Sequence, residues 1–217
     1  MNIYNKKYTV IKSVVSKELL DFCCQYIRLK KQVARTLFDT GFIPPFETMW
    51  GIWNDDQVQN TYSVYSDLAM EILLQKIKPI MEKELNLELV ENYSYLRIYK
   101  KGDVLLRHKD RMSCEISTTL NLGGDSWPIY LEPDPSVGAF DKDDVYCPGN
   151  TKGVRIDLEP GDMLVYLGCE LEHWRDKFEG EECVQVFLHY NDFKTKGNKN
   201  KFDTRNMLGL PQDFKKN

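Results

Sequence analysis

The feature that most constrains the fold is a change to the two-residue period of β-strands at about residue 87. From there on, apolar and polar residues alternate in short segments separated by turn residues such as Gly123-Gly124 and Pro160-Gly161. Eight short strands with no helix between them are typical of a double-sheet jelly roll. We expect these strands near residues 87–99, 103–110, 114–122, 128–132, 153–157, 162–167, 171–176 and 183–191.

Two amphipathic helices are expected before the strands. Ser16 can cap a helix that continues to about Thr36. Ser66 can cap a second helix, which Pro79 is expected to kink or break before it ends near Glu84. The predicted fold class is therefore mainly β with α (α+β): a double-stranded β-helix, or jelly roll, with the N-terminal helices packed on one sheet.

The same pattern predicts a single domain over residues 1–192. Residues 1–86 would give helical support, with a short edge strand within 3–15, and residues 87–192 would form the barrel core. Residues 193–217 are rich in Lys and Asn, and we expect a C-terminal tail that docks loosely or is disordered. In the loop after the first helix, four aromatic residues are expected to cover the core: Phe42, Phe46, Trp50 and Trp53.

Composition limits the classes of partner. The chain has 217 residues, of which 42% are hydrophobic and 29% charged, as is ordinary for one globular domain. A net charge of −4 argues against nucleic acid as a partner, because such binding relies on clustered Lys and Arg. The first fifteen residues hold no apolar run, and no stretch approaches a membrane span. We therefore expect a cytoplasmic protein without a nucleic acid or membrane partner, with its six cysteines reduced.

Potential metal ligands stand at the end of the second expected strand. His108 and Asp110 are separated by one residue, and residues i and i+2 of a strand point to the same face. His173 lies near a later strand and could complete the set. Two histidines and one carboxylate are the usual ligands of non-haem Fe(II) oxygenases, which keep other coordination positions open. His108, Asp110 and His173 are the predicted metal-binding and catalytic residues, whereas His189 is expected to be structural.

A longer ordered set of residues agrees with this pattern. It comprises Arg97-Ile98-Tyr99, Gly102, His108-x-Asp110, Pro160-Gly161-Asp162 and His173. Over roughly residues 60–192 it resembles the 2-oxoglutarate/Fe(II)-dependent dioxygenases, in particular bacterial and phage members of the prolyl-4-hydroxylase-like branch. The resemblance implies an enzyme that binds Fe(II), 2-oxoglutarate and dioxygen, with ascorbate as an accessory reductant. It would hydroxylate a peptide or small-molecule substrate and release succinate and CO2.

The residue that would hold the distal carboxylate of 2-oxoglutarate departs from the family pattern. Relatives often place Arg or Lys nine or ten residues after the distal histidine, where this chain has Glu182 and Cys183. Arg175 shares the strand face of His173 and is the first candidate, because a guanidinium binds a carboxylate through two parallel hydrogen bonds. Arg97 is the second candidate. Further predicted co-substrate contacts are Tyr99, Thr119 and Gln185.

Other interpretations stay open from the sequence alone. A non-catalytic double-sheet module could bind a metal or ligand without turnover, and a zinc hydrolase could use a site of two histidines and one carboxylate. A hydrolase needs a general base, for which Glu172 is the nearest candidate and is expected to point outward. Arg111 could meet a substrate carboxylate or pair with Glu115. The prime substrate and the oligomeric state are left undetermined.

The segment 132–153 is longer than an ordinary connection between strands. It carries the charged residues Asp134, Asp141, Lys142, Asp143 and Asp144. We call it the insert, and we expect it to border the mouth of the active site and to move when substrate binds.

Overall fold

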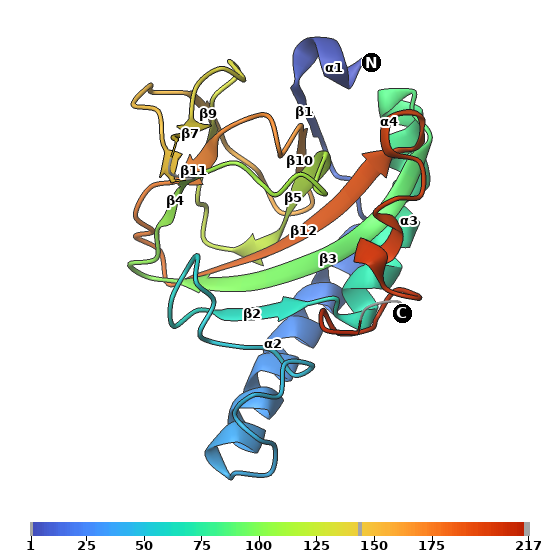
Figure 1. Ribbon diagram of the computed structural model, residues 1–217. Helices are drawn as coiled ribbons and strands as arrows, with labels where there is room; N and C mark the ends of the chain where they lie inside the picture. The colour runs from blue at the N-terminus through green and yellow to red at the C-terminus, as the bar shows by residue number, and fades with distance from the viewer. Residues whose placement is uncertain (1, 143–144, 215–217) are drawn as a thin grey trace.

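The computed structural model describes residues 2–142 and 145–214, and its strands form two facing antiparallel sheets (Figure 1). The larger sheet has the spatial order β1 (Tyr8–Ile11), β10 (Met163–Tyr166), β5 (Ile116–Gly124), β12 (Glu182–Asp192), β3 (Leu89–Lys100) and β2 (Tyr62–Tyr65). The smaller sheet has the order β4 (Leu105–His108), β11 (His173–Arg175), β6 (Ile129–Leu131) and β9 (Val154–Ile156). This arrangement confirms the predicted jelly roll.

All eight expected strands are present, together with three strands that were not expected. β2 pairs with β3 at the edge of the larger sheet. β7 (Ala139–Phe140) and β8 (Tyr146–Cys147) form a two-stranded ribbon within the insert. β7 and β8 have only two residues each and are too short to show a period, whereas β2 is defined by its pairing with β3. The expected edge strand is β1, and it follows a short helix, α1 (Ile3–Lys6), that was not predicted.

Helix α2 (Lys17–Asp39) begins as the sequence indicates and runs three residues beyond the expected end. The Ser16 hydroxyl accepts a hydrogen bond from the backbone N–H of Leu19 at 3.3 Å. In helix α3 (Leu68–Leu85) the N-cap is Asp67 rather than Ser66. The Asp67 carboxylate accepts from the N–H groups of Ala69 and Met70, so it satisfies two donors that the first turn leaves unpaired.

Pro79 lies inside α3 and does not end it. A proline removes one backbone hydrogen bond from a helix, which makes continuation unfavourable in isolation. Here Ile77 and Met81, on either side of Pro79, are both completely buried, and Leu85 in the last turn is buried as well. Apolar contacts with the sheet on both sides of the proline therefore hold the helix together.

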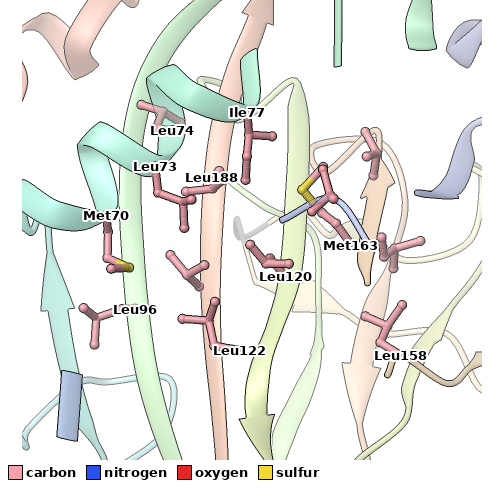
Figure 2. Packing of buried hydrophobic residues seen from close by; sticks show 14 of the residues in the cluster. Met70, Leu73, Leu74, Ile77, Leu96, Leu120, Leu122, Leu158, Met163 and Leu188 are labelled. Atoms are coloured by element: carbon pink, nitrogen blue, oxygen red, sulfur yellow. The ribbon is translucent and has the colours of Figure 1, made fainter. Parts of the chain in front are cut away.

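The main core lies between the helices and the larger sheet (Figure 2). In α3, Met70, Leu73, Leu74 and Ile77 point toward leucines of the central strands. These leucines are Leu96, Leu120, Leu122 and Leu188. Removal of this apolar surface from water is the main driving force for packing the helices on one face of the sheet.

Alternation along β3 divides its residues between this core and the space between the sheets. Leu96 and Ile98 belong to the apolar cluster under the helices. Tyr95, Arg97 and Tyr99 lie on the opposite face and line a cavity. Because the helices cover one face, polar side chains can gather on the other, where the two sheets meet.

The C-terminal segment is more firmly docked than expected. It contains α4 (Phe193–Lys196) and the 3-10 helix η1 (Lys201–Thr204). The buried Arg205 forms an ion pair with Glu71 of α3 at 3.2 Å, and the buried Asp203 accepts a hydrogen bond from Tyr65. The polar composition of this segment gave no sign of this buried ion pair. The prediction of loose docking is therefore wrong for the described residues up to 214.

The loop after α2 also differs from the prediction. Phe42 and Phe46 are 80% and 82% exposed, so they do not cover the core. Trp50 is exposed too, whereas Trp53 packs between Phe38 and Tyr62. All six cysteines are free, as expected. Among the described residues, no helix combines the length and apolarity that crossing a membrane requires.

The packing of α3 on the sheet generates a stability prediction. Leu74 is 0% exposed, and Leu74→Ala should lower the free energy of unfolding by about 2–5 kcal/mol, because it removes buried methyl groups and leaves a cavity. Ile72 lies on the same helix and is 65% exposed, so Ile72→Ala should change stability by no more than about 0.5 kcal/mol. Urea denaturation measures both values. Equal losses for the two variants would contradict the assigned packing face.

Candidate metal centre

Three potential ligands converge where β4 and β11 pair. His108 ends β4, His173 begins β11, and the two residues are direct partners in the antiparallel register. The Nε2 atoms of His108 and His173 lie 3.8 Å and 3.6 Å from Oδ1 of Asp110. The ligand atoms of the three residues all lie within 4.8 Å of one another. In the described parts of the chain, this is the one group of His, Cys, Asp or Glu with the spacing of a metal site.

Backbone carbonyls fix the orientation of both imidazole rings. Nδ1 of His108 lies 2.8 Å from the Leu106 carbonyl, and Nδ1 of His173 lies 3.0 Å from the Leu171 carbonyl. A carbonyl only accepts, so each Nδ1 carries the proton. Each Nε2 then presents its lone pair toward Asp110, which is the form of imidazole that binds a metal.

The Asp110 carboxylate is held by groups around it, although the strand has ended two residues earlier. Its backbone N–H donates to the Gly168 carbonyl at 2.9 Å. Oδ2 accepts from the Ser117 hydroxyl at 2.6 Å, which leaves Oδ1 facing the two histidines. Any side chain at position 168 would collide with Ser117 Oγ and with Asp110 Oδ2, so the close approach requires glycine there.

Burial and mutual contact set the charges of this group. Burial, together with the neighbouring His173, lowers the pKa of His108 to about 4. Burial alone would raise the pKa of Asp110, but His173, His189 and His108 together outweigh it and hold that pKa well below its ordinary value. At neutral pH the His108 ring is therefore neutral and the Asp110 carboxylate ionised, which is the state that a cation requires.

The three residues open into a cavity of about 200 Å³ between the sheets. Its wall is rich in aromatic side chains from β3, β10 and β12, and two polar residues of the loop before β2 cover it. The lining residues are Asp55, Gln57, Tyr93, Tyr95, Arg97, Tyr99, Leu105, His108, Asp110, Ile129, Tyr166, His173, Phe187 and His189. His189, which we expected to be structural, thus borders the cavity, and its Nδ1 lies 3.1 Å from Ser117 Oγ.

The insert does not border this cavity, contrary to expectation. None of the described residues of the insert lines it. The insert instead packs on the outer side of the smaller sheet, where the Glu172 carboxylate accepts from Tyr146 and from the N–H of Gly149. Glu172 also pairs with Arg107 at 3.0 Å and points away from the cavity, as predicted, although it is completely buried. Two of the charged residues noted in the insert, Asp143 and Asp144, lie outside the described residues.

Arg175 is almost completely buried, at 1% exposure, beside two other predicted co-substrate residues. Nη2 lies 3.4 Å from Thr119 Oγ1, and the Thr119 hydroxyl donates to Gln185 at 3.0 Å. Nη1 donates to the Trp127 carbonyl, whereas Nε has no hydrogen-bond partner in the described structure. No carboxylate of the described chain forms an ion pair with Arg175. The structure thus brings Arg175, Thr119 and Gln185 together around a buried positive charge, but none of the three lines the cavity.

Arg97 is also buried, but its charge is already neutralised. Nη2 pairs with Asp55 at 2.7 Å, and Nη1 donates to Gln57 at 3.0 Å and to Tyr99 at 3.3 Å. Tyr95 donates a second, short hydrogen bond to Asp55 at 2.5 Å. No sequence pattern pointed to Asp55 and Gln57, because they belong to an irregular loop more than thirty residues before β3.

Arg111 does not pair with Glu115, which was one of the two partners expected for it, in the described structure. It pairs with Asp203 of the C-terminal segment at 2.9 Å and lies over the Tyr93 ring. Glu115 instead accepts hydrogen bonds from Thr195 and from the N–H of Asp192. The residue after Asp110 therefore connects the metal centre to the C-terminal segment.

No family model and no curated protein matches the chain, but solved structures do. A prolyl-4-hydroxylase from Pseudomonas putida aligns over 88% of this chain and 95% of that one, with a TM-score of 0.56 and 15% identity. The epimerase SnoN from nogalamycin biosynthesis is described as non-heme and alpha ketoglutarate dependent. It aligns over 88% of this chain and 80% of its own, with a TM-score of 0.60 and 12% identity. EctD from S. alaskensis, determined with bound Fe, aligns over 89% of this chain and 75% of its own, with a TM-score of 0.59 and 13% identity. The chain thus has the fold of the 2-oxoglutarate/Fe(II)-dependent dioxygenases that its sequence resembles.

Proposed function

We propose that the chain is a non-haem Fe(II)- and 2-oxoglutarate-dependent dioxygenase that hydroxylates a peptide or small-molecule substrate and releases succinate and CO2. The observation that carries this proposal is the convergence of His108, Asp110 and His173, with two Nε2 atoms and one carboxylate oxygen, at a cavity. The fold adds support, because EctD with bound Fe and SnoN in complex with Fe3+ and alpha ketoglutarate share it.

The donor set suits iron that must keep positions free. Two neutral imidazoles and one carboxylate occupy three coordination positions and leave the remainder for a co-substrate and dioxygen. A zinc hydrolase would need a carboxylate poised to activate water. Glu172 is held outside the barrel by Arg107, and Asp55 in the cavity is bound to Arg97 and Tyr95. These contacts favour the oxygenase over the hydrolase.

Arg175 is the best-supported anchor for 2-oxoglutarate. A buried guanidinium without a counter-charge is strongly unfavourable, so its environment suits an incoming carboxylate. Nε of Arg175 is an unused donor, and Thr119 and Gln185 lie beside it. Tyr99, which lines the cavity, would border the same co-substrate. Arg97 is less suited to this role, because a second carboxylate would have to displace Asp55.

Each group of residues in the proposed site would have a separate role. When bound, Fe(II) with 2-oxoglutarate and dioxygen would supply the oxidising chemistry. His108, Asp110 and His173 would hold the metal, and Arg175 would orient the co-substrate. The aromatic wall formed by Tyr93, Tyr95, Tyr99, Tyr166 and Phe187 would exclude water and position the prime substrate.

A coupled assay tests the proposal. The purified protein is incubated with Fe(II), 2-oxoglutarate and oxygen, and succinate is measured against pools of peptides, amino acids and other small molecules. We expect substrate-dependent succinate release together with a product heavier by one oxygen atom. Binding of iron without any 2-oxoglutarate turnover would favour the non-catalytic module instead.

Substitution of the ligands tests the metal site. His108→Ala, Asp110→Ala and His173→Ala should each abolish stoichiometric Fe(II) binding, since each removes one of three ligands. The fold should persist, because the core under the helices does not include these residues. Metal content after anaerobic reconstitution and the far-UV circular dichroism spectrum check both statements.

Asp157→Asn is a matched control, because Asp157 is exposed on the surface and pairs only with Arg155 in the contacts described. This variant should bind iron like the wild type. Retention of one Fe(II) per chain by His173→Ala would refute the ligand assignment.

Substitution of Arg175 tests the co-substrate anchor. A hydrogen bond to a charged group contributes about 1.5–3 kcal/mol. At about 1.4 kcal/mol per tenfold change, Arg175→Ala should weaken 2-oxoglutarate binding by about tenfold to a hundredfold. Arg175→Lys keeps the charge but loses the planar pair of donors, so its loss should be intermediate. The dissociation constant is followed through the Fe(II) charge-transfer band under nitrogen.

Iron binding should be unchanged in the Arg175 variants, and Arg155→Ala serves as a surface control on the same sheet. If Arg175→Ala binds 2-oxoglutarate normally while Arg97→Ala does not, the anchor is on β3. Normal binding by both variants would exclude both arginines.

A further inference from the structure

The two oxygens of the Asp110 carboxylate are in different environments. Oδ1 faces the Nε2 atoms of His108 and His173, at 3.8 Å and 3.6 Å. Oδ2 accepts the hydrogen bond from Ser117 at 2.6 Å. A carboxylate has a broad, nearly two-fold torsion about its last bond, so this side chain has no intrinsic preference for which oxygen faces the histidines. Something outside Asp110 must select the orientation.

Ser117 is built into the larger sheet at the right place. It lies in β5, completely buried, between His189 of β12 and Tyr166 of β10 in the sheet register. Two acceptors lie near its single hydroxyl proton, the Asp110 carboxylate at 2.6 Å and the Cys114 carbonyl at 3.4 Å. The carboxylate takes the proton, because it is closer and charged. The hydroxyl oxygen can then accept from His189.

The direction of the next bond follows from this. Nδ1 of His189 lies 3.1 Å from Ser117 Oγ, so Nδ1 carries the proton and donates it. The His189 ring is held in place by Tyr93, which stacks on it with ring centroids 4.5 Å apart. The hydrogen bonds thus run in one direction, from His189 to Ser117 and from Ser117 to Asp110 Oδ2.

We propose that His189 and Ser117 are positioning residues, which hold Asp110 with Oδ1 turned toward the metal position and Oδ2 turned away from it. Neither residue binds the metal. His189 fixes the rotation of the Ser117 hydroxyl, and the hydroxyl fixes the carboxylate. Gly168 leaves the space in which this contact forms. The proposal rests on the proposed metal site.

The role predicts coupled effects on metal affinity. Groups that orient a metal ligand typically contribute about 10–100-fold to affinity. Ser117→Ala should weaken binding by roughly that factor. His189→Leu should weaken binding less, because Ser117 can still donate from a freely rotating hydroxyl. In the double variant the loss should equal that of Ser117→Ala alone, since His189 acts only through the hydroxyl.

The probe is Co(II), whose binding is measured by calorimetry and whose visible spectrum reports the geometry of its ligands. His189→Asn places an N–H donor near the position of Nδ1 and should restore the affinity and the spectrum that His189→Leu loses. Ser94→Ala is the matched control: Ser94 is equally buried in the same sheet, but it lies on the face under α3 beside Glu71. Circular dichroism and the thermal midpoint establish that each variant is folded.

The outcomes separate this proposal from the proposed function. If the wild type binds no metal, the metal site itself is wrong. If the wild type binds Co(II) and Ser117→Ala binds it equally well, the metal site stands and the positioning role fails. Additive losses in the double variant, or no recovery with His189→Asn, would also overturn it. If Ser117→Ala does not fold, the comparison of His189→Leu with His189→Asn still decides.

Discussion

The antiparallel pairing of β4 with β11 is the interaction on which the candidate site depends. It places His108 and His173 opposite each other, and Asp110 follows two residues later. A slip of one residue in a strand turns every side chain to the other face, so one histidine would leave the cavity. The register is secured from outside the barrel, because Arg107 pairs with Glu172 and lies over Trp174, with 3.5 Å between its guanidinium carbon and the ring centre. The residues that flank the ligands on the outer face therefore hold the strands that carry the ligands.

The insert lies on this same outer side of the smaller sheet. Its contacts include Glu172 and Lys109, whose ammonium group donates to the carbonyls of Pro135 and Gly138. Arg107 also donates to Thr151 of the insert. Lys109 and Glu172 are sequence neighbours of proposed ligands, directly after the end of β4 and directly before the start of β11. The insert thus packs behind the candidate metal centre, whereas Asp55 and Gln57, from the loop before β2, line the cavity. A long charged segment can either pack behind a site or cover its mouth. Only the residues that the segment contacts distinguish these two roles.

Local patterns predicted much of the fold, and distant pairs account for what they missed. Strand alternation predicted eight strands, and the i, i+2 spacing of His108 and Asp110 predicted their convergence. The ion pair of Arg205 with Glu71, and that of Arg97 with Asp55, join residues far apart in the sequence, where no period connects them. The prediction that Phe42 and Phe46 cover the core was wrong for a related reason. The hydrophobicity of a side chain does not say whether another surface is available to pack against it.

The two buried arginines show how partners, rather than burial, distinguish roles. The sequence only ranked Arg175 before Arg97 as the anchor for 2-oxoglutarate. Burial does not separate them either, because both are almost completely buried between the sheets. Arg97 has a carboxylate from its own chain, whereas Arg175 has neutral partners and an unused Nε. The two positions where proteins of the resembled family often carry this charge hold Glu182, which pairs with Arg28 of α2, and the buried Cys183. With Arg175 two residues after His173 on β11, one strand carries both a proposed metal ligand and the proposed anchor. A shift of β11 would therefore displace the proposed metal ligand and the proposed anchor at the same time.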